Sequence, residues 1–96
     1  MPKAYWVGHV TVTNPEGYKD YVAANAEAFR KYGGRFIVRG GKYETRSGTE
    51  RQRHVVIEFD SFAQAKACYD SPEYQAAAKI RDANAIVDLV IVEGVE

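Results

Sequence analysis

The segment Ile86–Val92 constrains the fold most, because it carries apolar side chains at both odd and even positions. Alternate side chains of a β-strand point to opposite faces of a sheet, so this pattern predicts a strand buried on both faces. The few short helices available to 96 residues cover one face of a small sheet, not two. The second face must then meet another chain, and the sequence therefore predicts a homodimer.

Composition limits the classes of function that suit the chain. It has 13 basic and 13 acidic residues, so no net charge attracts it to nucleic acid or to an anionic membrane surface. The single cysteine, Cys68, excludes an internal disulfide and is typical of the reducing cytoplasm. No apolar run suits a signal peptide or a membrane span. We expect one cytoplasmic domain over residues 1–96, with no metal or other cofactor.

The order of periodic segments and breaks predicts four strands and three helices. Helices are expected to begin after Asn14, Ser61 and Ser71, which are residue types that cap helix starts, and Gly33-Gly34 is expected to end the first helix. The expected strands cover residues 3–13, 35–39, 53–59 and 86–92, and residues 42–46 continue the second strand before a turn at 47–50. This βαββαβ order predicts an α+β, ferredoxin-like domain with a four-stranded antiparallel sheet and its helices on one face.

Alternation of side chains assigns the first and third strands to two faces. The face expected to lie under the helices carries Val10, Val12, Val55, Ile57 and Phe59. The second face carries Tyr5, Val7, His9, Thr11, His54, Val56 and Glu58. With these two strands parallel and aligned at their following helix caps, His9 lies level with Val56 and Thr11 with Glu58.

A polar group is expected on the second face. A tight hairpin places Arg39 opposite Glu58, whereas a one-residue shift at Gly40-Gly41 would send Arg39 to the other face. In the first register, His9, Arg39 and Glu58 gather on one surface. That arrangement suits a dimer interface that surrounds a semi-polar cavity.

Three of these residues have both a functional and a structural interpretation. Arg39 could orient an anionic ligand and Glu58 could act as a base, but a cross-strand ion pair is the favoured interpretation. His9 is the better proton carrier because its unperturbed pKa lies near neutrality, although a lone histidine in a strand is more often a packed residue. A metal site formed by His9, His54 and Glu58 lacks the close ligand spacing of such sites. His54 is expected to be solvated.

Residues around the last two helices offer further candidates. Tyr69 and Tyr74 flank the helix break at Ser71-Pro72, and either hydroxyl could reach a ligand in a cleft between helices and sheet. Arg81 is expected to pair with a neighbouring acid. Cys68, on an apolar helix face, is expected to be a buried and unreactive thiol.

The whole chain resembles the domain-of-unknown-function family 1330 of the dimeric α+β barrel superfamily. The resemblance rests on the motifs Asn14-Pro15-x-x-Tyr18-x-x-Tyr21, Gly33-Gly34-Arg35, Val38-Arg39-Gly40-Gly41, Val56-x-Glu58-Phe59-x-Ser61, Tyr69-x-Ser71-Pro72-Glu73-Tyr74 and Val92-Glu93-Gly94. It implies a ferredoxin-like protomer that pairs sheet to sheet. The superfamily includes cofactor-free monooxygenases, isomerases and lyases, haem-handling enzymes and ligand-sensing domains, a range that implies fold rather than chemistry.

Two function classes follow. The first is a homodimer that binds a small, partly apolar molecule in a cleft of each protomer, with His9 as acid or base in cofactor-free oxygenation or isomerisation and Arg39 and Glu58 positioning the ligand. The alternative is a non-catalytic binding or assembly module whose polar cluster is structural. RNA recognition on the sheet is excluded, because the third strand shows His54, Val56 and Glu58 where base-stacking aromatic residues are needed.

Overall fold

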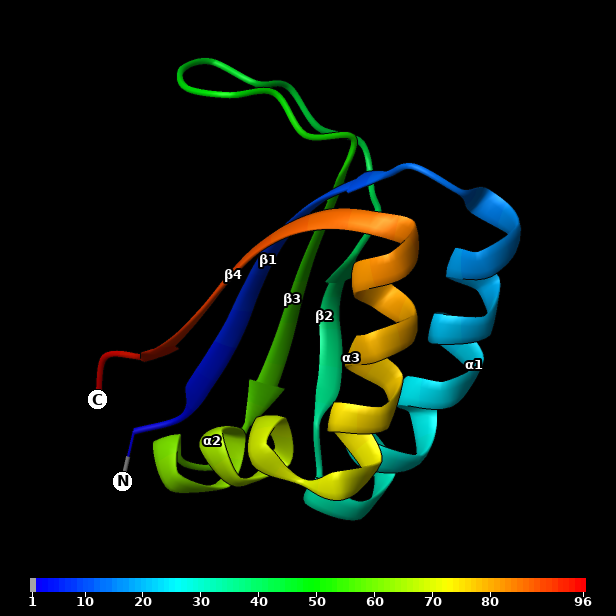
Figure 1. Cartoon of the computed structure of the whole chain (residues 1–96). Coiled ribbons are helices and arrows are strands. Elements are labelled where there is room, and N and C mark those ends of the chain that lie inside the picture. Colours follow the sequence, from blue (N-terminus) through cyan, green and yellow to red (C-terminus); the bar gives the residue numbers. More distant parts are fainter. Residues whose placement is uncertain (1) are drawn as a thin grey trace.

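The computed structural model of the protein describes residues 2–96. Its elements, in order, are β1 (Ala4–Val12), α1 (Pro15–Tyr32), β2 (Arg35–Arg39), β3 (Arg53–Phe59), α2 (Phe62–Asp70), α3 (Pro72–Asn84) and β4 (Ala85–Glu93). The strands form one sheet in the order β2-β3-β1-β4, with every neighbouring pair antiparallel. Helices α1 and α3 lie side by side on one face of the sheet (Figure 1). The expected α+β, ferredoxin-like fold is confirmed.

The relative direction of β1 and β3 differs from the expectation. The two strands are antiparallel, so His9 lies opposite His54 and Tyr5 lies opposite Glu58. The parallel alignment, with Thr11 level with Glu58, is wrong. The crossover through α1 makes β2 parallel to β1. The chain then reverses direction, and β3 lies between β1 and β2. Strand β3 is therefore antiparallel to both of them.

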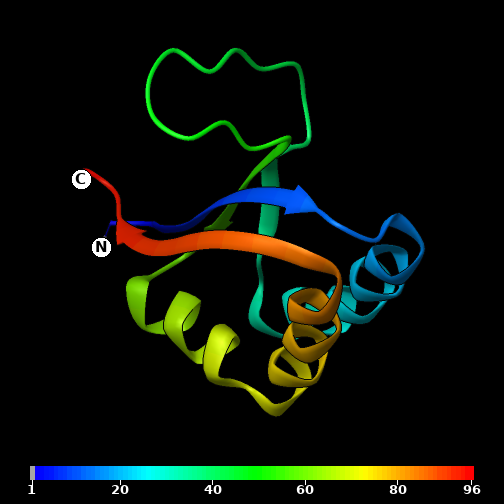
Figure 2. The same cartoon turned by 45° about the horizontal axis from the view of Figure 1, so that its top comes forward.

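The connection between β2 and β3 is a loop rather than a continued hairpin. Residues 40–52 project from the sheet as one long excursion, so the expected strand over residues 42–46 is wrong (Figures 1 and 2). Gly40 donates its N–H to the carbonyl oxygen of His54 over 2.9 Å and then turns the chain away with a φ of 68°. Only glycine adopts that backbone conformation without strain, so the strand ends there.

The helix ends follow the capping chemistry of the sequence with one exception. Ser61 and Ser71 each accept a hydrogen bond from the backbone N–H three residues later, at 3.1 Å, and Gly33 ends α1 in the left-handed conformation. Asn14 occupies the first cap position but makes no side-chain cap. Its Nδ2 instead donates to Oδ1 of Asn84 over 2.9 Å, which ties the start of α1 to the end of α3.

The core is centred on Trp6 in the first half of β1. Its side chain is fully buried, and its Nε1–H donates to the carbonyl oxygen of Ala65 in α2 over 2.9 Å. The surrounding rings, with centroids 4.7–5.5 Å away, belong to Phe29, Phe59, Tyr69 and Tyr74. These rings come from β3 and all three helices, so one indole joins both layers of the fold.

Helices α2 and α3 present their inward faces partly as expected. Cys68 is buried, and burial raises the pKa of its thiol to about 12, so the thiol stays protonated at neutral pH. In α3, the spacing of small and apolar residues predicts that Ala76, Ala77 and Ile80 face inward; Ala77 is buried and Ile80 is half-buried, but Ala76 is exposed. Ala78 and Arg81 are buried instead, because the helix is rotated so that a charged side chain faces the interior.

Replacing Phe59 by alanine tests the role of the aromatic core. Phe59→Ala removes a fully buried ring 5.4 Å from that of Trp6, and we expect the free energy of unfolding to fall by about 3–5 kcal/mol. Urea unfolding followed by Trp6 fluorescence measures the change. Phe62→Ala, at an exposed position, is the matched control and should change it by less than about 0.5 kcal/mol. Equal effects of the two substitutions would contradict this core.

Candidate functional site

An interior cavity lies between the sheet and helices α1 and α3. Its floor is apolar and includes Val10, Val55 and Leu89 from three neighbouring strands. Gly8 leaves the space open, because a Cβ there would lie 3.0 Å from Cγ2 of Val55. About 30 Å³ can hold the centre of a water molecule, which is room for roughly two waters. A ligand of a few non-hydrogen atoms therefore fits without a large movement.

One wall of the cavity carries a hydrogen-bonded network of phenols and a guanidinium. The hydroxyl groups of Tyr21 and Tyr74 lie 2.7 Å apart. Arg81 donates from Nη1 to the Tyr74 hydroxyl over 3.0 Å and from Nη2 to the Tyr69 hydroxyl over 3.3 Å. Its Nε pairs with Asp82 at 3.0 Å, which confirms the expected neighbouring acid. The rest of the guanidinium reaches the interior, and only 7% of Arg81 is exposed to solvent.

The charge states of this network follow from its surroundings. Burial raises the pKa of Tyr74, and the adjacent Tyr21 adds to the effect, so the phenol remains protonated and acts as a hydrogen-bond donor. Burial opposes the charge of Arg81, but its hydrogen bonds to Tyr69 and Asp82 and the nearby Tyr74 outweigh that effect and raise its pKa. The cavity wall therefore carries a permanent positive charge.

Asn25 adds a buried amide with an unmet hydrogen-bond requirement. It lines the cavity from α1, only 4% of it is exposed, and its Oδ1 has no hydrogen-bond partner among the described residues. Buried polar atoms are almost always paired, so each exception calls for an explanation. The sequence held a signal for this residue, because Asn25 occupies an apolar position of α1 between Tyr21 and Phe29.

Two further arginines lie around the cavity. The guanidinium carbon of Arg39 is 4.2 Å from the ring centroid of Phe36, and that of Arg53 is 5.9 Å from the ring centroid of Tyr18. The described residues that line the cavity include three arginines and no aspartate or glutamate. Burial raises the pKa of Tyr18 while Arg53 and Arg81 oppose the rise, so both cations act on this phenol.

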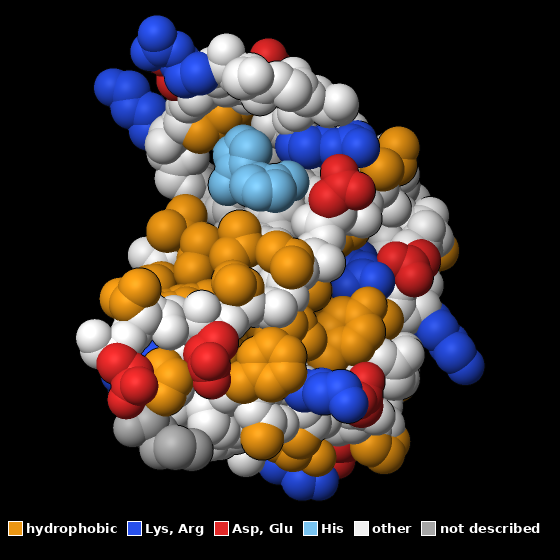
Figure 3. All heavy atoms as spheres, turned by 90° about the vertical axis from the view of Figure 1, so that its left-hand side faces the viewer, with side chains coloured by type: hydrophobic (Ala, Val, Ile, Leu, Met, Phe, Trp, Pro, Cys, Tyr) orange, Lys and Arg blue, Asp and Glu red, His pale blue; other side chains and the backbone are white. Residues whose placement is uncertain are grey.

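The opposite face of the sheet is apolar in its centre. Val38, Val56, Val7 and Val90 form a row in which each residue lies opposite the next across all four strands. On β4, Ile86, Val90 and Val92 are 50%, 55% and 45% exposed. We call this surface the open face, and Figure 3 shows its hydrophobic side chains beside the two histidines. The helix side of the last strand is covered, whereas its second face is exposed in the single chain, so the expected burial of both faces stays a prediction that depends on a second copy.

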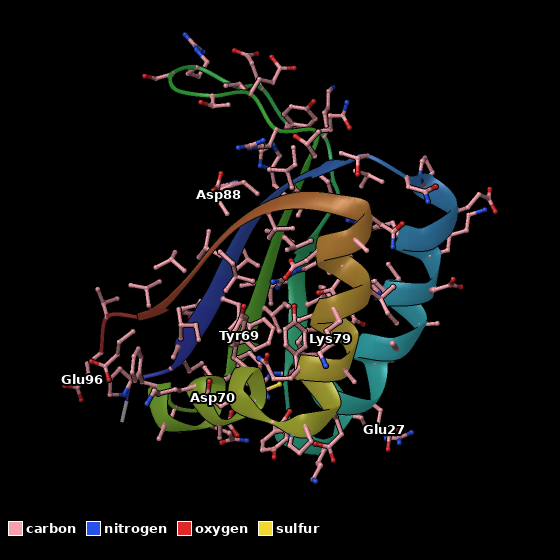
Figure 4. The ribbon with its side chains drawn as sticks, viewed as in Figure 1. Glu27, Tyr69, Asp70, Lys79, Asp88 and Glu96 are labelled. Carbon is pink, nitrogen blue, oxygen red and sulfur yellow. The ribbon has the colours of Figure 1, made fainter. Side chains whose placement is uncertain are left out.

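A second row on the open face pairs the histidines. Nδ1 of His9 and Nδ1 of His54 lie 2.8 Å apart, and the Tyr43 ring from loop 40–52 lies 4.6 Å from that of His54 between centroids. His54 is half-buried, so the expectation of a solvated side chain is wrong. Asp88, which projects away from the helices in Figure 4, forms an ion pair with Arg51 at 3.2 Å.

Glu58 belongs to a third row, apart from the histidines. Its Oε1 accepts from Nη2 of Arg35 over 3.0 Å, and its Oε2 lies 3.5 Å from the Tyr5 hydroxyl. The expected pairing of Glu58 with Arg39 is wrong. A register shift between Phe36 and Val38 places Arg39 opposite Val55, so Arg39 turns toward the helix side and Arg35 takes the position opposite Glu58.

The predicted site residues therefore do not form one group. His9 and Glu58 share the open face on separate rows, Arg39 lies at the interior cavity, and the hydroxyls of Tyr69 and Tyr74 bind Arg81. Among residues 2–96, no group of three or more His, Cys, Asp or Glu side chains is placed to hold a metal ion. None of the helices in the described part of the chain is long and apolar enough to cross a membrane.

Known structures of the same architecture define the class of fold. A protein of unknown function from Rhodopseudomonas palustris has a TM-score of 0.81 at 17% identity, covering 99% of this chain and 84% of that one. SnoaB, a cofactor-independent oxygenase from Streptomyces nogalater, has a TM-score of 0.67 at 15% identity over 100% of this chain and 96% of its own. A dimeric ferredoxin-like protein of unknown function from Bacteroides fragilis has a TM-score of 0.57 at 17% identity, covering 96% of both chains.

The chain belongs to the family described as domain of unknown function DUF1330, whose model matches residues 3–95. No curated protein is similar enough to match it. The likeness to the solved structures is one of fold, since all of these identities are 20% or lower. The chemistry must therefore be argued from this chain's own residues.

The phenol network can be tested by removing one oxygen atom. Tyr74→Phe leaves the Tyr21 hydroxyl and one N–H of Arg81 without their buried partner, and we expect the free energy of unfolding to fall by about 1–3 kcal/mol. Urea unfolding followed by circular dichroism provides the measurement. Tyr43→Phe, in the exposed loop, is the matched control and should be nearly neutral. A neutral Tyr74→Phe would show that the network adds nothing to stability.

Proposed function

We propose that each protomer binds a small, partly apolar molecule in the cavity between the sheet and helices α1 and α3. The observation that carries this proposal is Asn25, whose buried Oδ1 lacks a partner among the described residues at the wall of a cavity with an apolar floor. Leaving such an atom unpaired costs stability unless something else satisfies it. A bound molecule with one polar group and a short apolar part supplies both the missing hydrogen bond and the contacts with the floor.

Asn25→Leu tests the proposal, because it separates stability from binding. Leucine has a similar size and a higher helix propensity, so removing the unpaired amide should raise the free energy of unfolding by about 1 kcal/mol. The same substitution should abolish the rise in melting temperature that a ligand produces by mass action. A thermal-shift screen of small metabolites against both proteins measures the two effects together.

Gln52→Leu is the matched control, since it replaces an exposed amide that does not line the cavity. It should leave both stability and ligand response unchanged. A panel in which no compound stabilises the natural protein, or in which Asn25→Leu responds as strongly, would overturn the proposed binding function.

We also propose that two copies pair through their open faces. The valine row gives a continuous apolar strip across the sheet, and the flanking rows carry both signs of charge together with the histidine pair. A surface of this kind is self-complementary, as a two-fold interface requires. The dimeric neighbour from Bacteroides fragilis supports the proposal through its shared fold.

A charge placed in the centre of the valine row tests the dimer. Val90→Lys should convert a dimer at micromolar concentration to a monomer, because a lysine would be buried there without a partner. Sedimentation velocity measures the change in mass. Val95→Lys introduces the same charge at a position 97% exposed and should leave the dimer intact. A natural protein that is already monomeric at this concentration would end the proposal.

Cofactor-free oxygenation or isomerisation is the second candidate function, with His9 and Glu58 as the groups that move protons. The observation that favours it is the His9–His54 contact, in which Nδ1 of one ring donates a hydrogen bond to Nδ1 of the other. This pair borders a groove between the open face and loop 40–52 that Tyr43 and Arg51 also line. The alternative is a non-catalytic module, in which the polar rows only set the register of the two sheets.

His9→Ala discriminates these alternatives. If His9 transfers a proton, turnover of a compound found in the screen should fall by about 10²–10⁴-fold while the protein stays dimeric. Oxygen consumption and product formation are the measurements, and Glu58→Gln is compared in parallel. Unchanged turnover in dimeric His9→Ala would remove His9 from the mechanism and favour the non-catalytic module.

A further inference from the structure

We propose that the ligand of the interior cavity is a short organic acid whose carboxylate binds the guanidinium groups of Arg53 and Arg81. This inference rests on the binding function proposed above and specifies the chemical class of the ligand. It follows from the charge balance of the cavity, from the hydrogen-bond donors left over on its wall and from its size.

The charge balance of the cavity is positive. Arg39, Arg53 and Arg81 line it, and no described aspartate or glutamate does. The one carboxylate on Arg81 belongs to Asp82, which is 66% exposed and lies on the outer side of the helix. Within residues 2–96, no carboxylate oxygen lies within 4.0 Å of a nitrogen of Arg39 or Arg53. Arg81 is buried and has Asp82 as its counter-ion, Arg53 is half-buried and has none among the described residues, and Arg39 is exposed, so an anion bound in the cavity would balance mainly the charge of Arg53.

Donor groups remain free on both arginines. Arg81 uses three of the five N–H groups of a guanidinium, one each on Asp82, Tyr74 and Tyr69. Nε of Arg53 is buried without any partner. Guanidinium groups form short, charge-assisted hydrogen bonds with carboxylates, often two at a time. A carboxylate in the cavity therefore satisfies donors that the protein leaves unpaired.

The remaining surface fixes the rest of the ligand. Beyond the arginines, the strands line the cavity with aliphatic side chains from β1, β3 and β4, with the rings of Trp6 and Phe36, and with the bare backbone of Gly8. Space for roughly two water molecules limits the apolar part to a few carbons. Asn25 can turn its amide so that either the oxygen or the nitrogen faces the ligand. Acids of two to four carbons match this description.

Propionate and propionamide distinguish an anion site from an apolar site. The full-length protein is titrated with sodium propionate or with propionamide, at ionic strength held constant with sodium chloride, and followed by ¹⁵N NMR. The Trp6 indole and the Gly8 amide are the reporters, because both residues line the cavity. We expect propionate to give saturable shifts at both reporters and to bind at least tenfold more tightly than the neutral amide.

Variants assign the carboxylate to its partners. Arg53→Gln and Arg81→Gln should each weaken propionate binding about tenfold or more, as expected for loss of a charge-assisted hydrogen bond. Arg46→Gln, at an arginine whose side chain is 84% exposed in loop 40–52, is the matched control and should bind normally. If Arg81→Gln does not fold, Arg53→Gln alone carries the test, because Arg53 forms no ion pair within residues 2–96.

The outcomes separate the two proposals. Equal binding of propionate and propionamide would overturn the anion inference while leaving the cavity as a binding site. Displacement of propionate by chloride at the same concentration would show that the site binds inorganic anions equally well, and this result would also overturn the anion inference. Absence of shifts at Trp6 and Gly8 with both compounds would remove the inference and the proposed binding function together.

Discussion

Burial of the Trp6 indole is the interaction on which both layers of this fold depend. The ring contacts aromatic side chains from β3 and from all three helices, and its N–H is bound to the backbone of α2. A displaced helix would expose this ring and break its hydrogen bond at the same time. The helices are thereby held to one face of the sheet, and in a chain of 96 residues none remains for the other. The exposed valine row is the direct consequence.

The same central strand explains the cavity. Two residues beyond Trp6, on the same face, β1 carries Gly8, so the large ring is followed by a position with no side chain. The layers cannot close over this gap, because the indole and its neighbours fix their spacing. The space that remains is bordered by Asn25 and Arg81, which reach it from the two helices that cover the sheet. Core and cavity are thus two results of one arrangement.

Local sequence signals predicted the elements well and their long-range relations less well. Serine caps, Gly33 and the two-residue alternation of β1 and β3 act within a few residues, and the structure follows them. The direction of β3 relative to β1 depends on the whole crossover, and the shift at Ile37 moved Arg39 away from Glu58. Helical spacing placed Asn25 on the apolar side of α1, but no sequence pattern reveals that its oxygen lacks a partner.

The energetics of the interior favour a ligand over a purely structural role for these polar groups. Apolar replacements of buried charges are often neutral or stabilising, so a small core gains little from Arg81 and Asn25 by themselves. The phenol partners of Arg81 use only part of its guanidinium, and the amide oxygen of Asn25 is left unpaired among the described residues. A ligand that completes both sets of hydrogen bonds binds the folded state alone and so adds its binding free energy to stability. On this view the free protein is the less stable form, and its stability without ligand is a lower limit for the complex.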